Sequence, residues 1–215
     1  MGNLKFDIVP PVTQVAAGVA LRASLGKQRP VWIAASTHAG EDEAMLAAHT
    51  RLMAAHADAV LILVPRHPQR FDEVAQLIEK SGGTFARRST GSVSNKASVL
   101  LGDSMGEMFT YLAAADLAFV GGSFVPIGGH NILEPAALGK PVLFGPHMHN
   151  FRTARELLLN AHAADEIATP ELLSAALIRL FADSARQQRM GNAGQRAVSA
   201  NRGALQRLLA ALETL

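Results

Sequence analysis

The sequence predicts an α/β fold with a doubly wound parallel sheet, and three observations support this. Short apolar runs alternate with amphipathic stretches, which is typical of strand-helix-strand units. Polar and glycine-rich segments come directly after several apolar runs, where the loops of a parallel sheet begin. With 215 residues, 49% of them hydrophobic, the chain can bury a sizeable core. We therefore expect a Rossmann-like sheet with helices on both faces and further helices at the carboxyl end.

The apolar runs are predicted to be strands, and the amphipathic segments between them are predicted to be helices. The strands are expected at Val31–Ala35, Ala59–Val64, Thr84–Arg87, Val99–Leu101, Leu117–Val120 and Pro141–Phe144. The helices are expected at Glu41–Ala57, Arg70–Ser81, Met105–Ala115, Ile132–Leu138 and Phe151–Asn160.

The carboxyl-terminal segment Thr169–Leu215 contains no strand candidate and is expected to form two or three helices that pack outside the sheet. Pro170 marks the start of one helix, because proline is tolerated in a first helical turn. Gly191, Gly194 and Gly203 are expected to interrupt the helices.

The polar stretch Arg88–Ala97 is expected to form a mobile loop between two edge strands, with an inert connector as the alternative. The sequence shows no internal repeat and no clear interdomain linker. We therefore expect one domain over residues 1–215.

The composition argues against several classes of protein. A formal net charge of +2 is too small to indicate bulk attraction to nucleic acid. The chain has no cysteine, which excludes disulfides and thiolate metal sites. It has no apolar run of about 18 residues and no signal-peptide pattern, so we expect it to be soluble. The motifs of common ATPases, dinucleotide-binding proteins, zinc proteases and serine hydrolases are also missing.

The most informative stretch is GGSFVPIGGHNILEPAALG, residues 121–139, where an apolar strand enters a glycine-rich loop and then a helix. Gly128 and Gly129 would let a ligand approach the main chain. The amides from these glycines to Asn131 precede a helix, and helix amides favour a phosphate. Glu134 would repel phosphate, so we expect it to accept a hydrogen bond from a nucleotide sugar. From the spacing alone, an ordinary glycine loop with Asn131 as a helix cap fits equally well.

Polar side chains also follow two of the earlier strands. Ser36 and Thr37 offer hydroxyl groups, and the acidic run Glu41–Glu43 behind them is most simply a helix-start signal. His38 is expected to be a hydrogen-bonded loop residue rather than an acid or base. Arg66 stands in a proline-framed turn and can present paired donors to a phosphate, although a surface arginine is the simpler interpretation.

Two further segments offer candidate contacts. In the turn over residues 102–107, backbone groups could form hydrogen bonds with the edge of a nucleotide base while Met105 packs on the face of that base. The alternatives are a core position for Met105 and a helix cap at Asp103. His147 and His149 have no acidic partner nearby, so we expect substrate contacts from their loop rather than a metal site.

Together, several blocks resemble the carboxyl-terminal half of the 3-deoxy-D-manno-oct-2-ulosonic acid (Kdo) transferases, which belong to the GT-B glycosyltransferases. The blocks are STHAGEDE, ILVPRHP and SFVPIGGHNILEPAALGKPVLFGPHMHNF. The resemblance covers nearly the whole chain, and even Gly2–Asp7, GNLKFD, looks like the family's passage from its first domain to its second. The pattern GGHNxLEPAAxGxP is long and specific.

The resemblance implies a two-domain enzyme that transfers Kdo from CMP-Kdo to a lipid A precursor in lipopolysaccharide biosynthesis, with no metal or cofactor. It would act at the cytoplasmic face of the bacterial inner membrane. This chain would be the donor-binding domain, without the amino-terminal domain that supplies the acceptor site, the base and the membrane contact. We therefore expect a soluble domain that binds CMP-Kdo or CMP, binds no nucleic acid and is catalytically inert alone.

By motif, the resemblance also assigns residues to the donor site. Arg66 and the loop ending in Gly129 and His130 would contact the CMP phosphate. Asn131 and Glu134 would bind the nucleotide, with Glu134 on the ribose.

The remaining assignments concern the cleft and the base. Ser36 and Thr37 would line the cleft, and Met105 and Gly106 would lie near the cytosine. The complete predicted donor site is Ser36, Thr37, Arg66, Met105, Gly106, Gly128, Gly129, His130, Asn131 and Glu134. Two alternatives stay open, namely a UDP-sugar transferase or epimerase of the same fold and a nucleotide-binding domain without catalysis.

Overall fold

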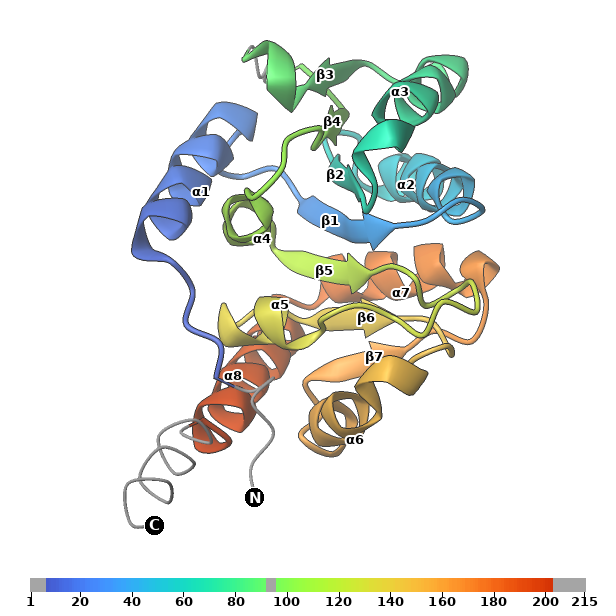
Figure 1. Cartoon of the computed structure of the whole chain (residues 1–215). Helices are drawn as coiled ribbons and strands as arrows, with labels where there is room; N and C mark the ends of the chain where they lie inside the picture. The colour runs from blue at the N-terminus through green and yellow to red at the C-terminus, as the bar shows by residue number, and fades with distance from the viewer. Residues whose placement is uncertain (1–6, 92–95, 203–215) are drawn as a thin grey trace.

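A computed structural model describes residues 7–91 and 96–202, and within these ranges seven strands form one sheet (Figure 1). The strands are β1 (Val31–Thr37), β2 (Val60–Pro65), β3 (Phe85–Arg87), β4 (Val99–Leu101), β5 (Leu117–Val120), β6 (Val142–Phe144) and β7 (Ala164–Glu166). Their order is β3-β4-β2-β1-β5-β6-β7, and all pairs are parallel. The predicted doubly wound α/β fold is therefore confirmed.

Helices cover both faces of this sheet (Figure 1). The α-helices are α1 (Val12–Leu25), α2 (Asp42–Ala55), α3 (Phe71–Lys80), α4 (Met108–Ala114), α5 (Leu133–Ala137), α6 (Arg152–Asn160), α7 (Pro170–Ala182) and α8 (Ser184–Ala200). The described chain also has short 3₁₀ turns η2 (Pro68–Arg70), η3 (Arg88–Thr90) and η4 (His149–Phe151). Helices α2, α3 and α7 pack on one face, and α1, α4, α5 and α6 pack on the other. Helix α8 contributes to both, with Met190 in the first core and Val198 in a core on the second face. None of these helices combines the length and apolar character that a membrane crossing requires.

The central strand β1 contributes to two cores because alternate side chains of a strand point to opposite faces. Trp32 and Ala34 pack in the core beneath α2, α3 and α7. Ile33 and Ala35 pack in the core beneath α1 and α4. Since both faces are covered, the inner strands are apolar throughout instead of alternating with polar residues, which explains the continuous apolar runs in the sequence.

The topology leaves a crevice between the loops that follow β1 and β5. The chain leaves β1 through α2 for β2 on one side, and it returns from β4 through α4 to β5 on the other side. Adjacent strands whose connections diverge in this way form a topological switch point, where open α/β sheets bind ligands beyond the carboxyl ends of their strands.

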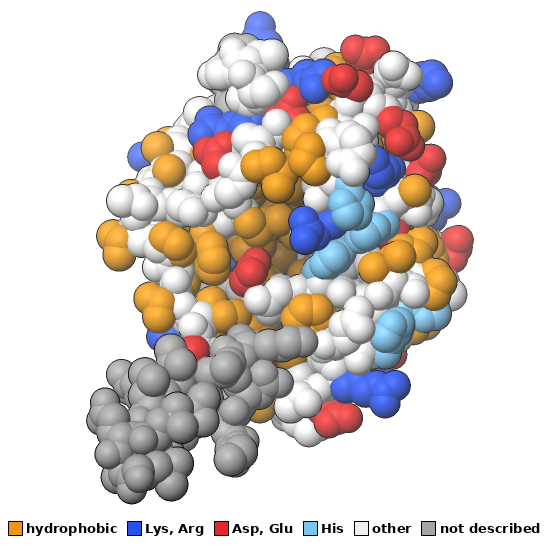
Figure 2. Space-filling view, viewed as in Figure 1, with side chains coloured by type: hydrophobic (Ala, Val, Ile, Leu, Met, Phe, Trp, Pro, Cys, Tyr) orange, Lys and Arg blue, Asp and Glu red, His pale blue; other side chains and the backbone are white. Residues whose placement is uncertain are grey.

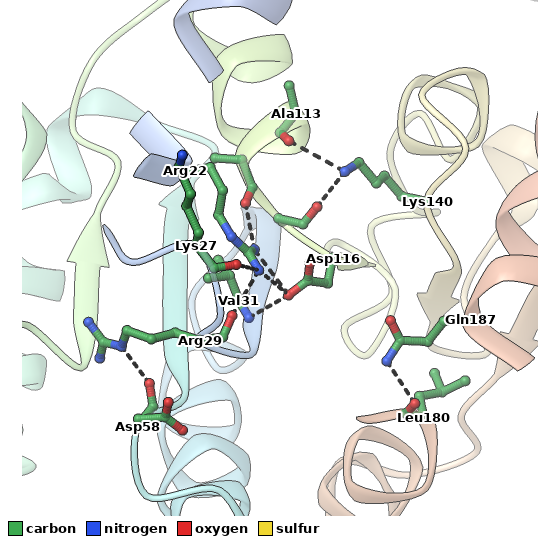
Figure 3. Close-up of polar contacts among 12 residues, drawn as sticks. Arg22, Lys27, Arg29, Val31, Asp58, Ala113, Asp116, Lys140, Leu180 and Gln187 are labelled. Carbon is green, nitrogen blue, oxygen red and sulfur yellow. Dashed lines mark hydrogen bonds and ion pairs between the residues drawn. The ribbon is translucent and has the colours of Figure 1, made fainter. Parts of the chain in front are cut away.

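Polar contacts join the elements at the opposite, amino-terminal edge of the sheet (Figure 3). Asp116 accepts hydrogen bonds from the Val31 amide at 2.8 Å and from Nη2 of Arg22 in α1 at 3.0 Å. Lys140 donates to the Ala115 carbonyl at the end of α4 at 2.6 Å, and burial lowers its pKa. These contacts tie α1, α4 and the strand starts together.

The predicted strands and helices are present, with ends displaced by up to three residues, but two elements were not predicted. Helix α1 was missed because its sequence shows no clear apolar face. Its buried residues are only Gly18, Leu21 and Leu25. Strand β7 is a three-residue edge strand. The expectation that residues 88–97 join two edge strands is wrong, because β4 lies between β3 and β2.

The predicted helix interruptions at Gly191 and Gly194 are also wrong, since both lie inside α8. A Cβ on Gly191 would stand 2.0 Å from the Gly139 carbonyl oxygen, so the glycine permits a close backbone contact. Pro170 does begin α7, as predicted. The predicted interruption at Gly203 lies outside the described residues, as does nearly all of Gly2–Asp7.

Candidate functional site

A cavity of about 330 Å³ opens at the carboxyl ends of β1, β2, β4 and β5, at the topological switch point. Its volume falls within the range of roughly 300 to 1,000 Å³ that is usual for small-molecule sites. Figure 2 shows this face with a hollow in which hydrophobic side chains lie deep, while histidine and basic side chains gather along one margin.

Most of the predicted donor-site residues meet in this cavity. Those that line it are Ser36, Arg66, Met105, Gly106, His130, Asn131 and Glu134. Thr37, Gly128 and Gly129 were also predicted but are not part of its lining. His147 and His149, which were expected to contact substrate, lie instead in a separate surface groove at the start of α6.

Ser36 reaches the cavity through an irregularity near the end of β1. The register against β2 shifts between Ala35 and Thr37, and Ser36 has a φ of 58°. A left-handed backbone is uncommon for a residue other than glycine, and such conformations cluster at functional sites. The resulting bulge redirects Ser36 into the cavity lining while its neighbours stay in the sheet.

Arg66 supplies positive charge at one wall of the cavity. Its amide donates to the Thr37 carbonyl at 2.9 Å, which ties the loop after β2 to the end of β1. The Arg66 side chain is exposed, and within the described residues it makes no ion pair. An exposed guanidinium without a carboxylate partner is suited to an external anion.

His130 stands beside Arg66 in a cluster of three histidines. Its Nε2 lies 2.7 Å from Nε2 of His38, and the two rings are nearly parallel. His67 contacts His38 edge to face at a centroid distance of 5.2 Å. Because a hydrogen bond between two ring nitrogens needs a hydrogen on one of them only, the rings are a donor and acceptor pair.

Burial keeps this histidine pair uncharged near neutral pH. It lowers the pKa of His130 to about 4, and electrostatic interactions with His38, Arg66 and His67 act in the same direction. Burial also lowers the pKa of His38, although Glu41 opposes this. Arg66 therefore provides the permanent positive charge at this wall.

Glu134 supplies a carboxylate to the cavity. Its Oε1 accepts from Asn131 Nδ2 at 3.2 Å, and Asn131 Oδ1 accepts from the Leu133 amide at 3.1 Å, at the start of α5. Burial raises the pKa of Glu134. Its hydrogen bonds within the described chain involve Oε1 alone, so Oε2 is available to a donor such as a hydroxyl group.

Met105 and Gly106 form the wall contributed by the loop after β4. Met105 is 63% exposed, so the interpretation of this residue as core is wrong. Gly106 has a φ of +78°, which few side chains tolerate. The turn is fixed by Ser104, whose hydroxyl hydrogen bonds with the Tyr111 hydroxyl at 2.5 Å and donates to Glu107. Met105 is thus held at the mouth of the cavity with its thioether available to a flat ring.

The predicted places of Thr37 and Asp103 need correction. Thr37 is fully buried and donates to Asp42 Oδ1 at 2.6 Å, so its hydroxyl does not line the cleft. Asp103 is not a helix cap, because it accepts from Arg87 Nε and from the Ser89 hydroxyl, both at 2.6 Å. Burial opposes ionisation of Asp103, but the contacts from Ser89 and Arg87 outweigh it and lower its pKa.

The predicted phosphate cradle of main-chain amides over residues 128–131 needs correction at Gly129. The Gly129 amide donates to the Gly122 carbonyl at 2.8 Å, so it is not free for a ligand. A Cβ on Gly128 would lie 2.4 Å from Asn150 Nδ2, and one on Gly129 would lie 2.3 Å from Met148 Sδ. The two glycines therefore let this loop pack closely against the loop after β6.

Glu41 has a role that the sequence did not reveal. Its buried carboxylate accepts from the amides of His38, Gly122, Ser123 and Phe124 at 2.7 to 3.1 Å. The converging amides in the loop after β5 could bind an anion, but in this structure they bind the carboxylate of Glu41. The sequence indicated only a helix start at Glu41, because three of its four partners are 81 to 83 positions away.

No group of three or more histidine, aspartate or glutamate side chains in the described ranges is arranged to hold a metal ion. The cavity instead offers one cation, one carboxylate, a neutral histidine and apolar walls. This set is suited to a ligand that combines an anionic group, hydroxyl groups and a flat ring.

Comparison with known proteins identifies the family. No family model matches the chain. The 3-deoxy-D-manno-octulosonic acid transferase of Haemophilus influenzae is 44% identical over 210 residues, which are 97% of this chain and 49% of that protein. The same enzyme of Bordetella pertussis is 43% identical over 219 residues, 99% of this chain and 50% of that protein.

A solved structure agrees with these relatives. The C-terminal CMP-Kdo binding domain of WaaA from Acinetobacter baumannii is 31% identical, with a TM-score of 0.83. The match covers 87% of this chain and 99% of that domain. The chain belongs to the 3-deoxy-D-manno-octulosonic acid transferase family. It spans about half the length of the curated relatives it matches.

In this member of the Kdo transferase family, the motif GGHNxLEPAAxGxP combines two tasks. Its paired glycines pack against the loop after β6. The residues that follow, His130, Asn131 and Glu134, line the cavity. The motif therefore fixes the loop with its two glycines and presents polar side chains with the residues that directly follow them.

Proposed function

We propose that this chain is the donor-binding part of an enzyme that transfers Kdo from CMP-Kdo, and that the cavity holds the cytidylate. One observation carries the proposal: Arg66, which has no ion-pair partner among the described residues, and Glu134 line the same cavity at the switch point of the sheet. A nucleotide needs these two groups together, a cation for its phosphate and a carboxylate for its sugar hydroxyls.

The cavity lining supports one orientation of the nucleotide. The phosphate would lie toward Arg66 and His130, and the ribose would donate a hydroxyl hydrogen bond to Glu134. The cytosine would lie beside Met105 and Gly106. This placement differs from a cradle of glycine amides, because the charge is met by side chains and the glycines stabilise the loop behind them.

In the proposed reaction, an acceptor hydroxyl forms a bond to the anomeric carbon of Kdo as the bond from that carbon to the phosphate oxygen breaks. CMP leaves with the electron pair, and a base from the other half of the enzyme takes the hydroxyl proton. Arg66 stabilises the negative charge that develops on the departing phosphate, and this favours the transition state over the bound donor.

The proposal also extends to the parts that this chain does not supply. The acceptor would be a lipid A precursor, bound by a further half that also provides the base and the membrane contact. The 215-residue chain alone would bind the donor without transferring Kdo.

A UDP-sugar transferase or epimerase domain is not favoured as the alternative. The relatives from Haemophilus influenzae and Bordetella pertussis are Kdo transferases, and the solved domain at 31% identity is described as binding CMP-Kdo.

Replacing Glu134 with alanine tests the proposed function. Loss of a buried hydroxyl contact should weaken CMP binding by about 1 to 3 kcal/mol, measured by titration calorimetry. Glu79→Ala is the matched control, because Glu79 is exposed on α3 and does not line the cavity. Equal CMP affinity in the Glu134→Ala variant and the wild type would remove Glu134 from the donor site.

A further inference from the structure

The loop after β5 forms a nest of converging amides, and Glu41 occupies it. Oε2 accepts from the His38 amide at 3.0 Å and the Gly122 amide at 2.7 Å. Oε1 accepts from the Ser123 amide at 3.1 Å and the Phe124 amide at 2.9 Å. Glu41 has no exposed surface, and the described residues place no cationic side chain in an ion pair with it. Backbone dipoles alone therefore compensate its buried charge.

Two chains of hydrogen bonds lead from Glu41 to the histidine pair at the cavity. The first passes through the amide of His38 to its ring, whose Nε2 lies 2.7 Å from Nε2 of His130. The second passes through Gly122, whose carbonyl accepts from the Gly129 amide at 2.8 Å, directly before His130.

Close packing makes this arrangement intolerant of displacement. A Cβ on Gly121 would lie 2.9 Å from Glu41 Oε2, and a Cβ on Gly122 would lie 2.9 Å from Cδ2 of His130. The backbone of these two glycines therefore fills the space between the carboxylate and the imidazole. A change in the carboxylate is transmitted to the ring, because the interior has no free volume to absorb it.

We propose that Glu41 is an internal anion that fills the amide nest after β5 and thereby positions the His38 and His130 pair at the wall of the cavity. Glu41 is a positioning residue, since it does not line the cavity itself. The nest is consequently a built site for a small carboxylate, and removal of the Glu41 side chain opens it to formate.

The groups around the histidine pair define what a titration reports. His38 faces Glu41, His67, Arg70 and Arg66. His130 faces His38, Arg66 and His67. Replacing Glu41 removes a carboxylate that raises the pKa of His38, but Glu41 is not among the groups that face His130. The titration of His130 therefore reports the position of the two rings.

The test compares Glu41→Ala and Glu41→Gln with Glu43→Gln. Glu43 is exposed on α2, two residues after Glu41, so Glu43→Gln makes the same charge change as Glu41→Gln but outside the nest. The ring nitrogens of His38 and His130 are followed by NMR as pH is changed. In the wild type and in Glu43→Gln, the two rings titrate as one linked pair, meaning that protonation of one ring changes the pKa of the other. In Glu41→Ala the linkage is lost, and the pKa of His130 moves toward the ordinary value of about 6.5.

Chemical rescue separates positioning from general stability. Addition of formate to Glu41→Ala should shift the amide signals of Gly122, Ser123 and Phe124 with a saturating dependence and should restore the linked titration. Persistence of the linked titration in folded Glu41→Ala would overturn the proposal, and so would a loss of linkage that saturating formate leaves unchanged.

The wild-type chain keeps the proposal testable if neither Glu41 variant folds. The amide nitrogens of Gly122 and Phe124 should then show through-hydrogen-bond coupling to the side-chain carboxyl carbon of Glu41, and its absence would contradict the nest. None of these measurements uses a nucleotide, so their failure and a failure of CMP binding are distinguishable.

Discussion

Arg66 carries the charge on which the proposed phosphate contact depends. Its guanidinium lines the cavity and makes no ion pair within the described residues. Arg66→Ala should weaken CMP binding by about 1.5 to 3 kcal/mol, the usual contribution of a hydrogen bond to a charged group. Calorimetry should find that cytidine, which has no phosphate, binds both proteins equally.

Two further variants refine this test of Arg66. Arg66→Lys should recover part of the lost affinity, because an ammonium keeps the charge but not the planar pair of donors. Arg51→Ala, at an exposed position on α2, is the control for a lost surface charge. An equal loss for CMP and cytidine in Arg66→Ala would mean that Arg66 does not contact the phosphate.

His49 gives the fold a pH dependence that is independent of the cavity. It is 2% exposed and accepts from Trp32 Nε1 at 3.2 Å. Burial lowers its pKa to about 4, whereas an unfolded histidine has a pKa of about 6.5. Between these values the unfolded state binds more protons, so this stability is complete above pH 6.5 and is lost as pH falls toward 4.

The predicted size of this effect is on the order of 3 kcal/mol of unfolding free energy. Denaturant unfolding at several pH values should show a shallower decline for His49→Gln, which keeps an acceptor for Trp32 but does not titrate. The other histidines are common to both proteins, so the difference between the two curves isolates His49. Parallel curves would show that His49 has the same pKa in the folded and unfolded states, which would contradict the effect of burial.

Among the elements, the contact of α8 with the turn after α5 depends on a glycine. Gly191→Ala would ordinarily stabilise a helix by roughly 1 kcal/mol. Here the new Cβ would stand 2.0 Å from the Gly139 carbonyl oxygen, which is backbone and cannot move aside freely. We expect the variant to lose about 1 to 3 kcal/mol in thermal or denaturant unfolding, as overpacked cores do.

Gly194→Ala is the matched control in the same helix. Its Cβ would be 3.3 Å from the Ala136 Cβ, a distance that a slight adjustment can relieve. A Gly191→Ala variant at least as stable as Gly194→Ala would contradict the close contact between α8 and Gly139.

Elements with strong local patterns were predictable from the sequence, and elements that depend on their surroundings were not. The inner strands are recognisable because both faces are buried, so β2 is apolar throughout. Strand β7 has the sequence ADE, without the branched or aromatic residues that favour strands, and it forms because β6 pairs with it at the edge.

The same distinction applies to the candidate site. Residues after strand ends were predictable as cavity residues because the topology of a parallel sheet brings those ends together, as for Arg66 and Glu134. The packing of Gly128 and Gly129 was not predictable from the sequence, since it depends on a loop some twenty positions away. Glu41 was missed for the same reason, because its acceptor role appears only when the loop after β5 folds over it.

For the molecule as a whole, we propose that cytidylate occupies the cavity with its phosphate at Arg66. Titration of isotope-labelled chain with CMP, followed by amide NMR, tests it most directly. We expect the chemical-shift changes to cluster at Ser36, Arg66, Met105 and Glu134, and we expect UMP to produce weaker changes. Shifts confined to residues outside the cavity, such as the groove between β7 and α8, would contradict it.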